Sequence, residues 1–142
     1  MTNYNSQEKI DQRANQIDPI IMYLVVRESL NMSAGKACAQ CAHASQMLLI
    51  KYFDMKYNAN IENLNKIRLF DDWLNTSFRK VVLVAKENQW NKLKEELSKN
   101  DYIIVTDNGL TEVAPQTDTV IGILPIIKST CPKIIKKLQT LK

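Results

Sequence analysis

The sequence predicts an α/β sandwich built on a mixed β-sheet, and three observations support that fold class. Four short apolar runs rich in β-branched residues indicate buried strands, at residues 20–26, 80–85, 102–106 and 119–124. Helical patterns follow the first and second runs and end the chain, so the order is strand, helix, strand, helix, strand, strand, helix. The last two strands are joined too closely for a helical crossover, so the sheet mixes parallel and antiparallel pairs.

Length and composition indicate one ordinary domain. The 142 residues are 45% apolar and 24% charged, with a formal net charge of +4. Residues 1–19 are polar and predict a mobile extension, which leaves residues 20–142 as the domain proper. We expect neither a secretory signal nor a membrane span, since no apolar run is long enough. Three cysteines, an odd number, fit reduced thiols and a cytoplasmic protein.

One long helix is expected after the first strand. Ser33 fits an N-cap, and the alanine-rich run behind it favours a helix to about Phe53. A surface connection over residues 54–65, rich in Asn and Lys, then leads to a helical turn or two over residues 67–74.

The second half of the chain is expected to hold two amphipathic helices. Asn88 is the expected cap of the first, which spans residues 88–100. Asp107-Asn-Gly109 is a turn signal, and Pro125 ends the fourth strand. Pro132 stands near the start of a final helix that carries the apolar residues Ile134, Ile135, Leu138 and Leu141.

Three polar side chains near the start of the long helix form the first candidate site. Lys36 falls in the first helical turn, where the positive end of the helix dipole disfavours a cation and favours an anion. At 100° per residue, Gln40 and His43 lie within about 40° of Lys36, so the three line one polar stripe. The neighbouring stripe has small and apolar residues that let the helix approach the sheet closely: Ala37, Cys41, Ala44 and Leu48. Alone this is weak evidence, since single lysines and histidines are common on helices.

A polar loop between the third and fourth strands forms the second candidate site. Residues 107–119 are unusually dense in hydroxyl and carboxylate side chains. Asp107 ends one strand as Lys36 follows another, and ligands of open α/β sheets bind at that edge. If the two strands are neighbours, Asp107 can stay ionised beside Lys36 and orient a water, which suits metal-free hydrolysis of an activated ester. The alternative is a simple hairpin turn in which Asp107 bonds its own backbone.

These segments resemble one known family, the peptidyl-tRNA hydrolases of the archaeal and eukaryotic type. The likeness rests on the strand Met22-Tyr-Leu-Val-Val-Arg27, on the run from Met32 to Ala44, and on residues 107–119 followed by Val120-Ile-Gly-Ile. The resemblance implies a three-layer sandwich, with a four-stranded mixed sheet and helices on both faces, and usually a homodimer. It implies hydrolysis of the ester that joins a peptide or an N-blocked amino acid to the 3′ end of tRNA, which frees the tRNA for reuse.

The resemblance also implies roles for individual residues. It assigns catalytic roles to Lys36, Asp107, Thr111 and Thr119, and supporting roles to Gln40 and His43. Asp107 is expected to orient the attacking water, and Lys36 to stabilise the oxyanion or the leaving oxygen. The loop departs from the family at Leu110, where an arginine is usual, and at Glu112, which adds negative charge near an RNA site. Other departures are Asn108, Gln116 and Thr117.

Basic residues provide the expected contacts to tRNA. After Asp118 the chain has no acidic residue, and a basic tail suits a polyanion such as RNA, although a solvated helix face gives the same pattern. We expect the acceptor end of peptidyl-tRNA to be held through its phosphates by Lys80, Lys86, Lys133, Lys136 and Lys137. We expect no metal, cofactor, DNA or membrane partner.

Three other interpretations compete with this one. Cys38-Ala-Gln-Cys41 is a C-x-x-C pair at a helix start, as in thioredoxin-like redox proteins, but no Trp or Gly-Pro surrounds it. Zinc binding by this pair and His43 has only Cys131 as a fourth ligand, and the helical positions point in different directions. The third is a non-catalytic RNA-binding protein that keeps the fold, which the altered loop suggests.

Overall fold

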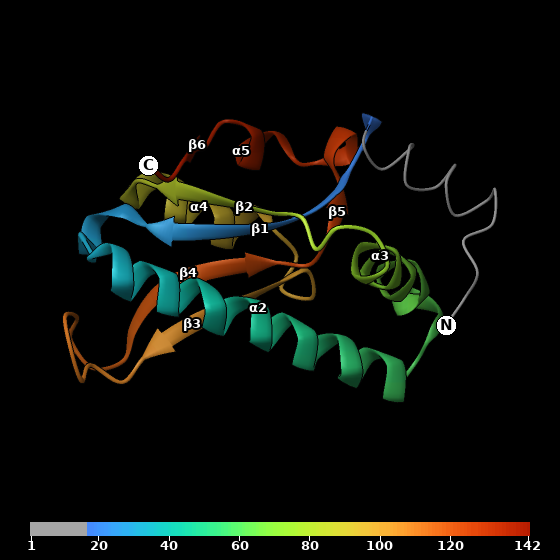
Figure 1. Ribbon diagram of the computed structural model, residues 1–142, viewed down its shortest axis with the longest axis horizontal. Coiled ribbons are helices and arrows are strands. Elements are labelled where there is room, and N and C mark those ends of the chain that lie inside the picture. Colours follow the sequence, from blue (N-terminus) through green and yellow to red (C-terminus); the bar gives the residue numbers. More distant parts are fainter. Residues whose placement is uncertain (1–16) are drawn as a thin grey trace.

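Six strands form one mixed sheet in the computed structural model, which describes residues 17–142 (Figure 1). Four are the expected strands: β1 (Ile20–Arg27), β2 (Lys80–Ala85), β3 (Tyr102–Asp107) and β4 (Thr117–Ile123). Two strands of two residues each add to them: β5 (Ile126–Ile127) and β6 (Gln139–Thr140). The expectation of four strands is therefore wrong, because two residues are too few to carry an alternating pattern.

The strand order brings the carboxyl ends of three strands to one edge. The order is β3-β4-β1-β2-β6, and β5 pairs with the start of β1. β1 and β2 are parallel, whereas β4 is antiparallel to both β1 and β3, so the mixed sheet is confirmed. β1, β2 and β3 consequently run in the same direction and end together, at the left of Figure 1.

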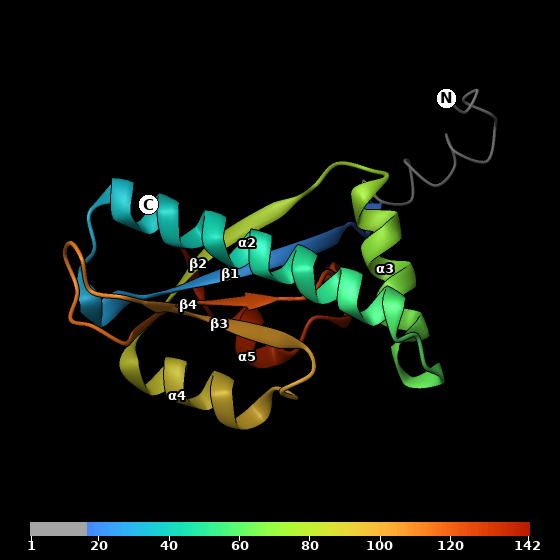
Figure 2. The same cartoon turned by 90° about the horizontal axis from the view of Figure 1, so that it is seen from below.

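Helices cover both faces of the sheet, as Figure 2 shows. α2 (Ala34–Tyr57) and α3 (Leu64–Leu74) lie on one face, and α4 (Glu87–Glu96) and α5 (Lys133–Lys136) lie on the other. Single 3₁₀ turns connect some of these elements: η1 (Glu28–Leu30), η2 (Ile61–Asn63) and η3 (Lys128–Thr130). The three-layer α/β sandwich is confirmed.

β1 is the centre of the core because it is buried on both faces. Its alternate residues Met22 and Leu24 join the apolar cluster under α2 and α3. Tyr23 and Val25 point the other way and join the cluster under α4 and α5. This double burial explains why the strand is a continuous apolar run in the sequence.

Small residues let α2 lie close to the sheet. Ala44 and Leu48 on α2 are fully buried, and they face Gly122 of β4. A Cβ on Gly122 would lie 3.0 Å from Leu48 Cδ1 and 3.3 Å from the Ala44 Cβ. The close approach of the helix to the sheet is thus confirmed, and it leaves the polar flank of α2 at the margin of the contact.

The expected final helix is mostly wrong. α5 ends at Lys136, and the chain then extends so that β6 pairs with β2. Leu138 is buried in the core, and the Leu141 N–H donates to Val82 O at 2.9 Å. The free edge of β2 thus satisfies backbone groups that a continued helix would have used, and this tertiary pairing overrides the helical pattern.

Other boundaries also differ from the expectation. The surface connection is shorter than residues 54–65, because α2 continues to Tyr57 and α3 begins at Leu64. The N-cap of α4 is Lys86 and not Asn88, and the Lys86 N–H donates to Gln89 Oε1 at 2.9 Å. An amide three residues into the helix therefore satisfies the start of α4, as in half of a capping box.

The chain is attached to the domain before β1 begins. The first 16 residues of the expected mobile extension lie outside the described residues. The Asp18 carboxylate accepts hydrogen bonds from the N–H and the hydroxyl of Ser129, at 2.9 and 2.6 Å, and Lys128 N–H donates to Pro19 O at 2.8 Å. Among residues 17–142, no helix has the length and apolar character to cross a membrane.

Candidate active site

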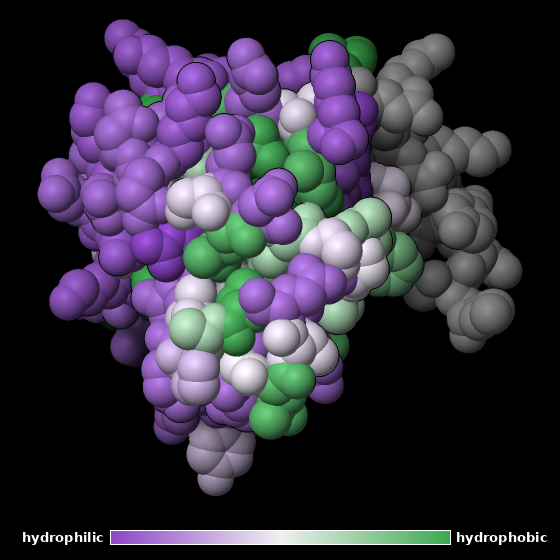
Figure 3. Space-filling model, turned by 90° about the vertical axis from the view of Figure 1, so that its left-hand side faces the viewer, coloured by the Kyte–Doolittle hydropathy of each residue, from purple (hydrophilic) through white to green (hydrophobic). Residues whose placement is uncertain are grey.

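Lys36 stands at the start of α2, just beyond the end of β1. Ser33 is the N-cap, as expected, and its hydroxyl accepts a hydrogen bond from the Lys36 N–H at 3.2 Å. This contact fixes the first helical turn on the edge where the strands end. Figure 3 views the molecule from that end, where apolar side chains lie within a largely hydrophilic surface.

Lys36 and Asp107 form an ion pair at this edge. Lys36 Nζ lies 2.8 Å from Asp107 Oδ1, and each side chain is 12% exposed. The premise that β1 and β3 are neighbours is wrong, because β4 lies between them. The pair forms because α2 packs on both β4 and β3 and so carries Lys36 across the sheet to the end of β3.

Asp107 uses its two oxygens differently. Oδ1 accepts from Lys36, whereas Oδ2 accepts from the Gly109 N–H at 2.7 Å, so the local turn and the long-range pair coexist. The hydrogen bond from Lys36 is the main cause that lowers the pKa of Asp107 below its ordinary 3.8, and the Gly109 N–H adds to it. Asp107 is therefore an ionised carboxylate at neutral pH.

Gln40 and Thr119 form a buried support behind Asp107. Gln40 is 2% exposed, and its Nε2 donates to Asp107 Oδ1 at 3.1 Å. Its Oε1 accepts the Thr119 hydroxyl at 2.5 Å, and Thr119 has no exposed surface. Thr119 thus orients Gln40, which in turn orients Asp107. The Thr119 hydroxyl also lies 3.3 Å from Val105 O of β3, a longer contact than its 2.5 Å bond to Gln40.

Two predicted residues do not join this network. Thr111 and His43 are both exposed, and neither side chain forms a hydrogen bond to another residue in the range 17–142. Thr111 lies in the loop between β3 and β4. The residue after it, Glu112, contacts Ser33 at the start of α2. The structure therefore brings together Lys36, Gln40 and Asp107 with Thr119, and leaves Thr111 and His43 facing outward.

Glu112 fastens the loop to α2, a role that the sequence did not predict. Its Oε2 accepts the Ser33 N–H at 2.8 Å, and its Oε1 accepts the Ser33 hydroxyl. These bonds, with the nearby Lys36 ammonium, lower the Glu112 pKa below its ordinary 4.5. The added negative charge is thus stabilised at a helix N-terminus, where a carboxylate is favourable. The sequence gives no signal for this role, because Ser33 and Glu112 are far apart along the chain.

Arg27 connects β4 to α4 close to the same edge. Its Nη1 donates to the Asp118 carbonyl at 3.2 Å, and its Nη2 and Nε donate to the Glu87 carboxylate at 2.5 and 3.2 Å. These bonds from Arg27, with one from Ser29, lower the pKa of Glu87 to about 2. Arg27 therefore fixes Asp118, the residue that precedes Thr119. No local signal in the sequence predicted this role of Arg27.

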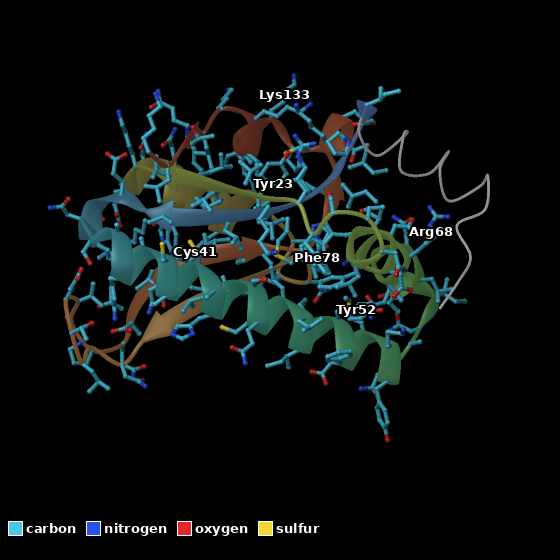
Figure 4. The ribbon with its side chains drawn as sticks, in the orientation of Figure 1. Tyr23, Cys41, Tyr52, Arg68, Phe78 and Lys133 are labelled. Carbon is cyan, nitrogen blue, oxygen red and sulfur yellow. The ribbon has the colours of Figure 1, made fainter. Side chains whose placement is uncertain are left out.

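The five lysines predicted to bind tRNA are exposed around the edge formed by β2 and β6. Lys80 begins β2 on the α2 side of the sheet, and Lys86 follows the end of β2. The other three lie on or directly after α5, on the opposite side, where Figure 4 labels Lys133. An RNA that contacts all five must pass along this edge.

The cysteines do not form a reactive pair. Cys38 is exposed and Cys41 is buried, and burial raises the pKa of Cys41 to about 11. A buried thiol that stays protonated is a poor nucleophile, which disfavours the redox interpretation. Within the described part of the chain, no three His, Cys, Asp or Glu side chains come together as metal ligands.

The fold and these side chains define an α/β sandwich with a lysine–aspartate site at the carboxyl edge of its sheet. A family model described as "Peptidyl-tRNA hydrolase PTH2" matches residues 20–141. The chain therefore belongs to the peptidyl-tRNA hydrolase PTH2 family, and the resemblance to the archaeal and eukaryotic type is confirmed.

Similar curated proteins carry the name "Peptidyl-tRNA hydrolase". One from Thermoplasma acidophilum is 33% identical over 125 residues, which cover 84% of this chain and 97% of the relative. One from Saccharolobus solfataricus is 29% identical over 127 residues, with 86% and 99% covered. One from Methanopyrus kandleri is 35% identical over 105 residues, with 72% and 81% covered.

Proposed function

We propose that this protein hydrolyses the ester between a peptide, or an N-blocked amino acid, and the 3′ end of tRNA. The names of its relatives support this substrate. The observation that carries the proposal is the Lys36–Asp107 pair, 2.8 Å apart and backed by the buried Gln40. RNA binding alone requires no carboxylate held in this way, since a carboxylate repels phosphates.

Asp107 orients the attacking water in this proposal. Among the described residues, its Oδ2 accepts only the Gly109 N–H, and a carboxylate oxygen can accept a second hydrogen bond. A water bound there would lie beside the Lys36 ammonium. Because its pKa is lowered, Asp107 is a weak base, which suits positioning a water better than removing its proton before attack.

Lys36 stabilises the negative charge that develops on the carbonyl oxygen or on the leaving 3′-oxygen. Its Nζ has three donors and Asp107 takes one, so donors remain for the substrate. We propose that no metal takes part, because an ammonium at 2.8 Å already neutralises Oδ1. Full activity after exhaustive chelation supports this part, and loss that zinc or magnesium restores would contradict it.

The acceptor stem follows the β2–β6 edge in this proposal. Phosphates there would contact Lys80 and Lys86 on one side and the lysines of α5 on the other. Affinity for tRNA should then fall by roughly 0.9 logarithmic units per decade of salt for each phosphate neutralised. A binding constant that does not change with salt would contradict this placement. Since tRNA is the substrate, we place the protein in the cytoplasm.

We also propose a homodimer, as in the family that the chain resembles. Three apolar side chains on the outer flank of α2 support it, because Met47, Ile50 and Phe53 are 36%, 55% and 57% exposed. Light scattering on the wild type should give twice the chain mass, and Ile50→Asp should lower it. A wild-type monomer at micromolar concentration would contradict the dimer.

The test of the activity is release of an N-acetyl-amino acid from N-acetyl-aminoacyl-tRNA. Lys36→Ala and Asp107→Ala should abolish the release, whereas Lys92→Ala, an exposed lysine on α4, serves as the matched control. Circular dichroism confirms that each variant is folded. If the wild type binds tRNA but releases nothing, the chain is an RNA-binding relative of the family and the proposal fails.

A further inference from the structure

An open apolar groove lies on the α2 side of the sheet, away from Asp107. It has a volume of about 610 Å³ and lies between α2, the end of α3 and β2. Figure 4 labels two of its lining residues, Cys41 on α2 and Phe78 on the α3–β2 connection. No aspartate or glutamate lines it, and Lys80 does. The groove therefore suits an occupant with apolar faces and negative charge.

Phe78 stands at this groove in an unusual conformation. Its side chain is 56% exposed, and its φ of +52° is rare for a bulky residue. The Trp73 ring packs edge-on against it, with centroids 5.8 Å apart and planes at 88°. The Lys80 ammonium lies 4.9 Å from the Trp73 centroid and 5.7 Å from that of Phe78. Strained backbone conformations cluster at active sites and ligand clamps.

Hydrogen bonds hold this aromatic cluster rigid before any ligand binds. Trp73 Nε1 donates to the Arg79 carbonyl at 2.8 Å, and that carbonyl also accepts the Met22 N–H of β1 at 3.0 Å. The Lys80 ammonium donates to Phe78 O at 3.2 Å. The segment Phe78-Arg79-Lys80 thus presents one exposed ring beside two cations, on a base fixed to the central strand.

Proteins bind single-stranded nucleic acid in grooves that combine exposed aromatic rings with cationic side chains. Bases stack on the ring, and the cations contact the backbone phosphates. We propose that this groove receives the unpaired 3′-terminal nucleotides of tRNA, with a base stacked on Phe78 and a phosphate at Lys80. The proposal rests on the proposed function, which supplies an RNA whose 3′ end reaches Lys36.

A path across α2 connects the groove to the ion pair. At 100° per residue, Gln40 and Ala42 lie on opposite flanks of the helix, one facing Asp107 and the other lining the groove. Between these flanks the first turns expose small side chains, including Gly35 and Ala39. A Cβ on Gly35 would meet nothing within 4 Å. A strand can therefore cross α2 at Gly35 and Ala39 without meeting a bulky side chain, on the C-terminal side of the Glu112 carboxylate that binds Ser33.

The first test measures binding of a short oligoribonucleotide that ends in CCA. Phe78→Ala should weaken binding by roughly 5- to 150-fold, the range that loss of one stacked base produces, and Phe78→Tyr should restore it. Lys80→Gln should reduce the salt dependence by about 0.7 logarithmic units per decade. Tyr57→Ala, which removes an exposed aromatic ring at the far end of α2, is the matched control. Equal binding by Phe78→Ala and wild type would overturn the proposal.

The second test uses the reaction. The ratio of kcat/KM for N-acetyl-aminoacyl-tRNA to that for the same ester of adenosine alone should fall in Phe78→Ala, through a higher KM for tRNA. If the ratio instead changes with the length of the esterified peptide, the groove holds peptide and the proposal is overturned. If the wild type hydrolyses neither ester, the proposed function fails. The oligoribonucleotide measurement then still tests whether the groove binds single-stranded RNA.

Discussion

The hydrogen bond from Thr119 to Gln40 makes a prediction that separates support of the site from catalysis. Thr119→Val keeps the side-chain shape but removes the hydroxyl that donates to Gln40 Oε1 at 2.5 Å. Both residues are at least 98% buried, so no water can replace the lost donor. An unsatisfied buried amide oxygen costs about 1 to 3 kcal/mol. For a chain of this length, that lowers the melting temperature by roughly 4 to 12 °C.

The same substitution should slow hydrolysis because Gln40 then no longer holds Asp107. Gln40→Leu, which removes both hydrogen bonds, should lower kcat by roughly tenfold. Thr119→Val should cost less than that, and it should have almost no further effect in the Gln40→Leu background, since the two act in one chain of contacts. Thr140→Val, at an exposed threonine whose hydroxyl forms no hydrogen bond within residues 17–142, is the control and should change stability by less than about 0.5 kcal/mol.

Thermal unfolding and steady-state hydrolysis of the four proteins in this cycle test the argument. Thr119→Ser, which keeps the donor, should recover most of the lost stability. Equal effects of Thr119→Val with and without Gln40 would refute the argument, because they would show that the hydroxyl acts on something other than Gln40.

Three further predictions concern charge and exposure. Because the pKa of Asp107 is lowered, Asp107 stays charged at every pH above its ordinary value of 3.8, and the stability that this charge contributes is lost only as the pH falls below that value. The kcat/KM for the adenosine ester should be lost over the same pH range. A fall in kcat/KM already near neutral pH would contradict the assignment of Asp107. Cys38 should react first with a thiol reagent at neutral pH, since Cys41 and Cys131 are buried with raised pKa values; fast labelling of Cys41 would revive the redox interpretation. Leu110→Arg, at a side chain 88% exposed, should tighten tRNA binding. It should also steepen the fall of affinity with salt by about 0.9 logarithmic units per decade, and an unchanged salt dependence would argue against RNA at this loop.

The local signals in the sequence predicted the elements that position the site. The apolar run of β1 and the N-cap Ser33 specify a strand and a helix start within a few residues, so Lys36 was placed correctly. Asp107 was also placed at the end of its strand. The pairing of the two was predicted for the wrong reason, because β4 separates the strands and the packing of α2 restores the contact.

The features that the sequence did not predict depend on contacts between distant segments. Glu112 reaches Ser33 and Arg27 reaches Glu87, and neither partner lies within reach of a local pattern. The end of the chain is the same case, because the helical spacing of Leu138 and Leu141 is overridden by pairing with the free edge of β2. The segment was amphipathic in either conformation, and only the exposed backbone of β2 decides between them.

The most direct test of the central claim is a double-mutant cycle on Lys36 and Asp107, measured by hydrolysis of N-acetyl-aminoacyl-tRNA. If the two act as one unit, each single alanine variant lowers kcat almost as far as the double variant, because removing either partner disables the pair. Losses in kcat that multiply in the double variant would contradict the account, since they would mean that the ammonium and the carboxylate contribute independently.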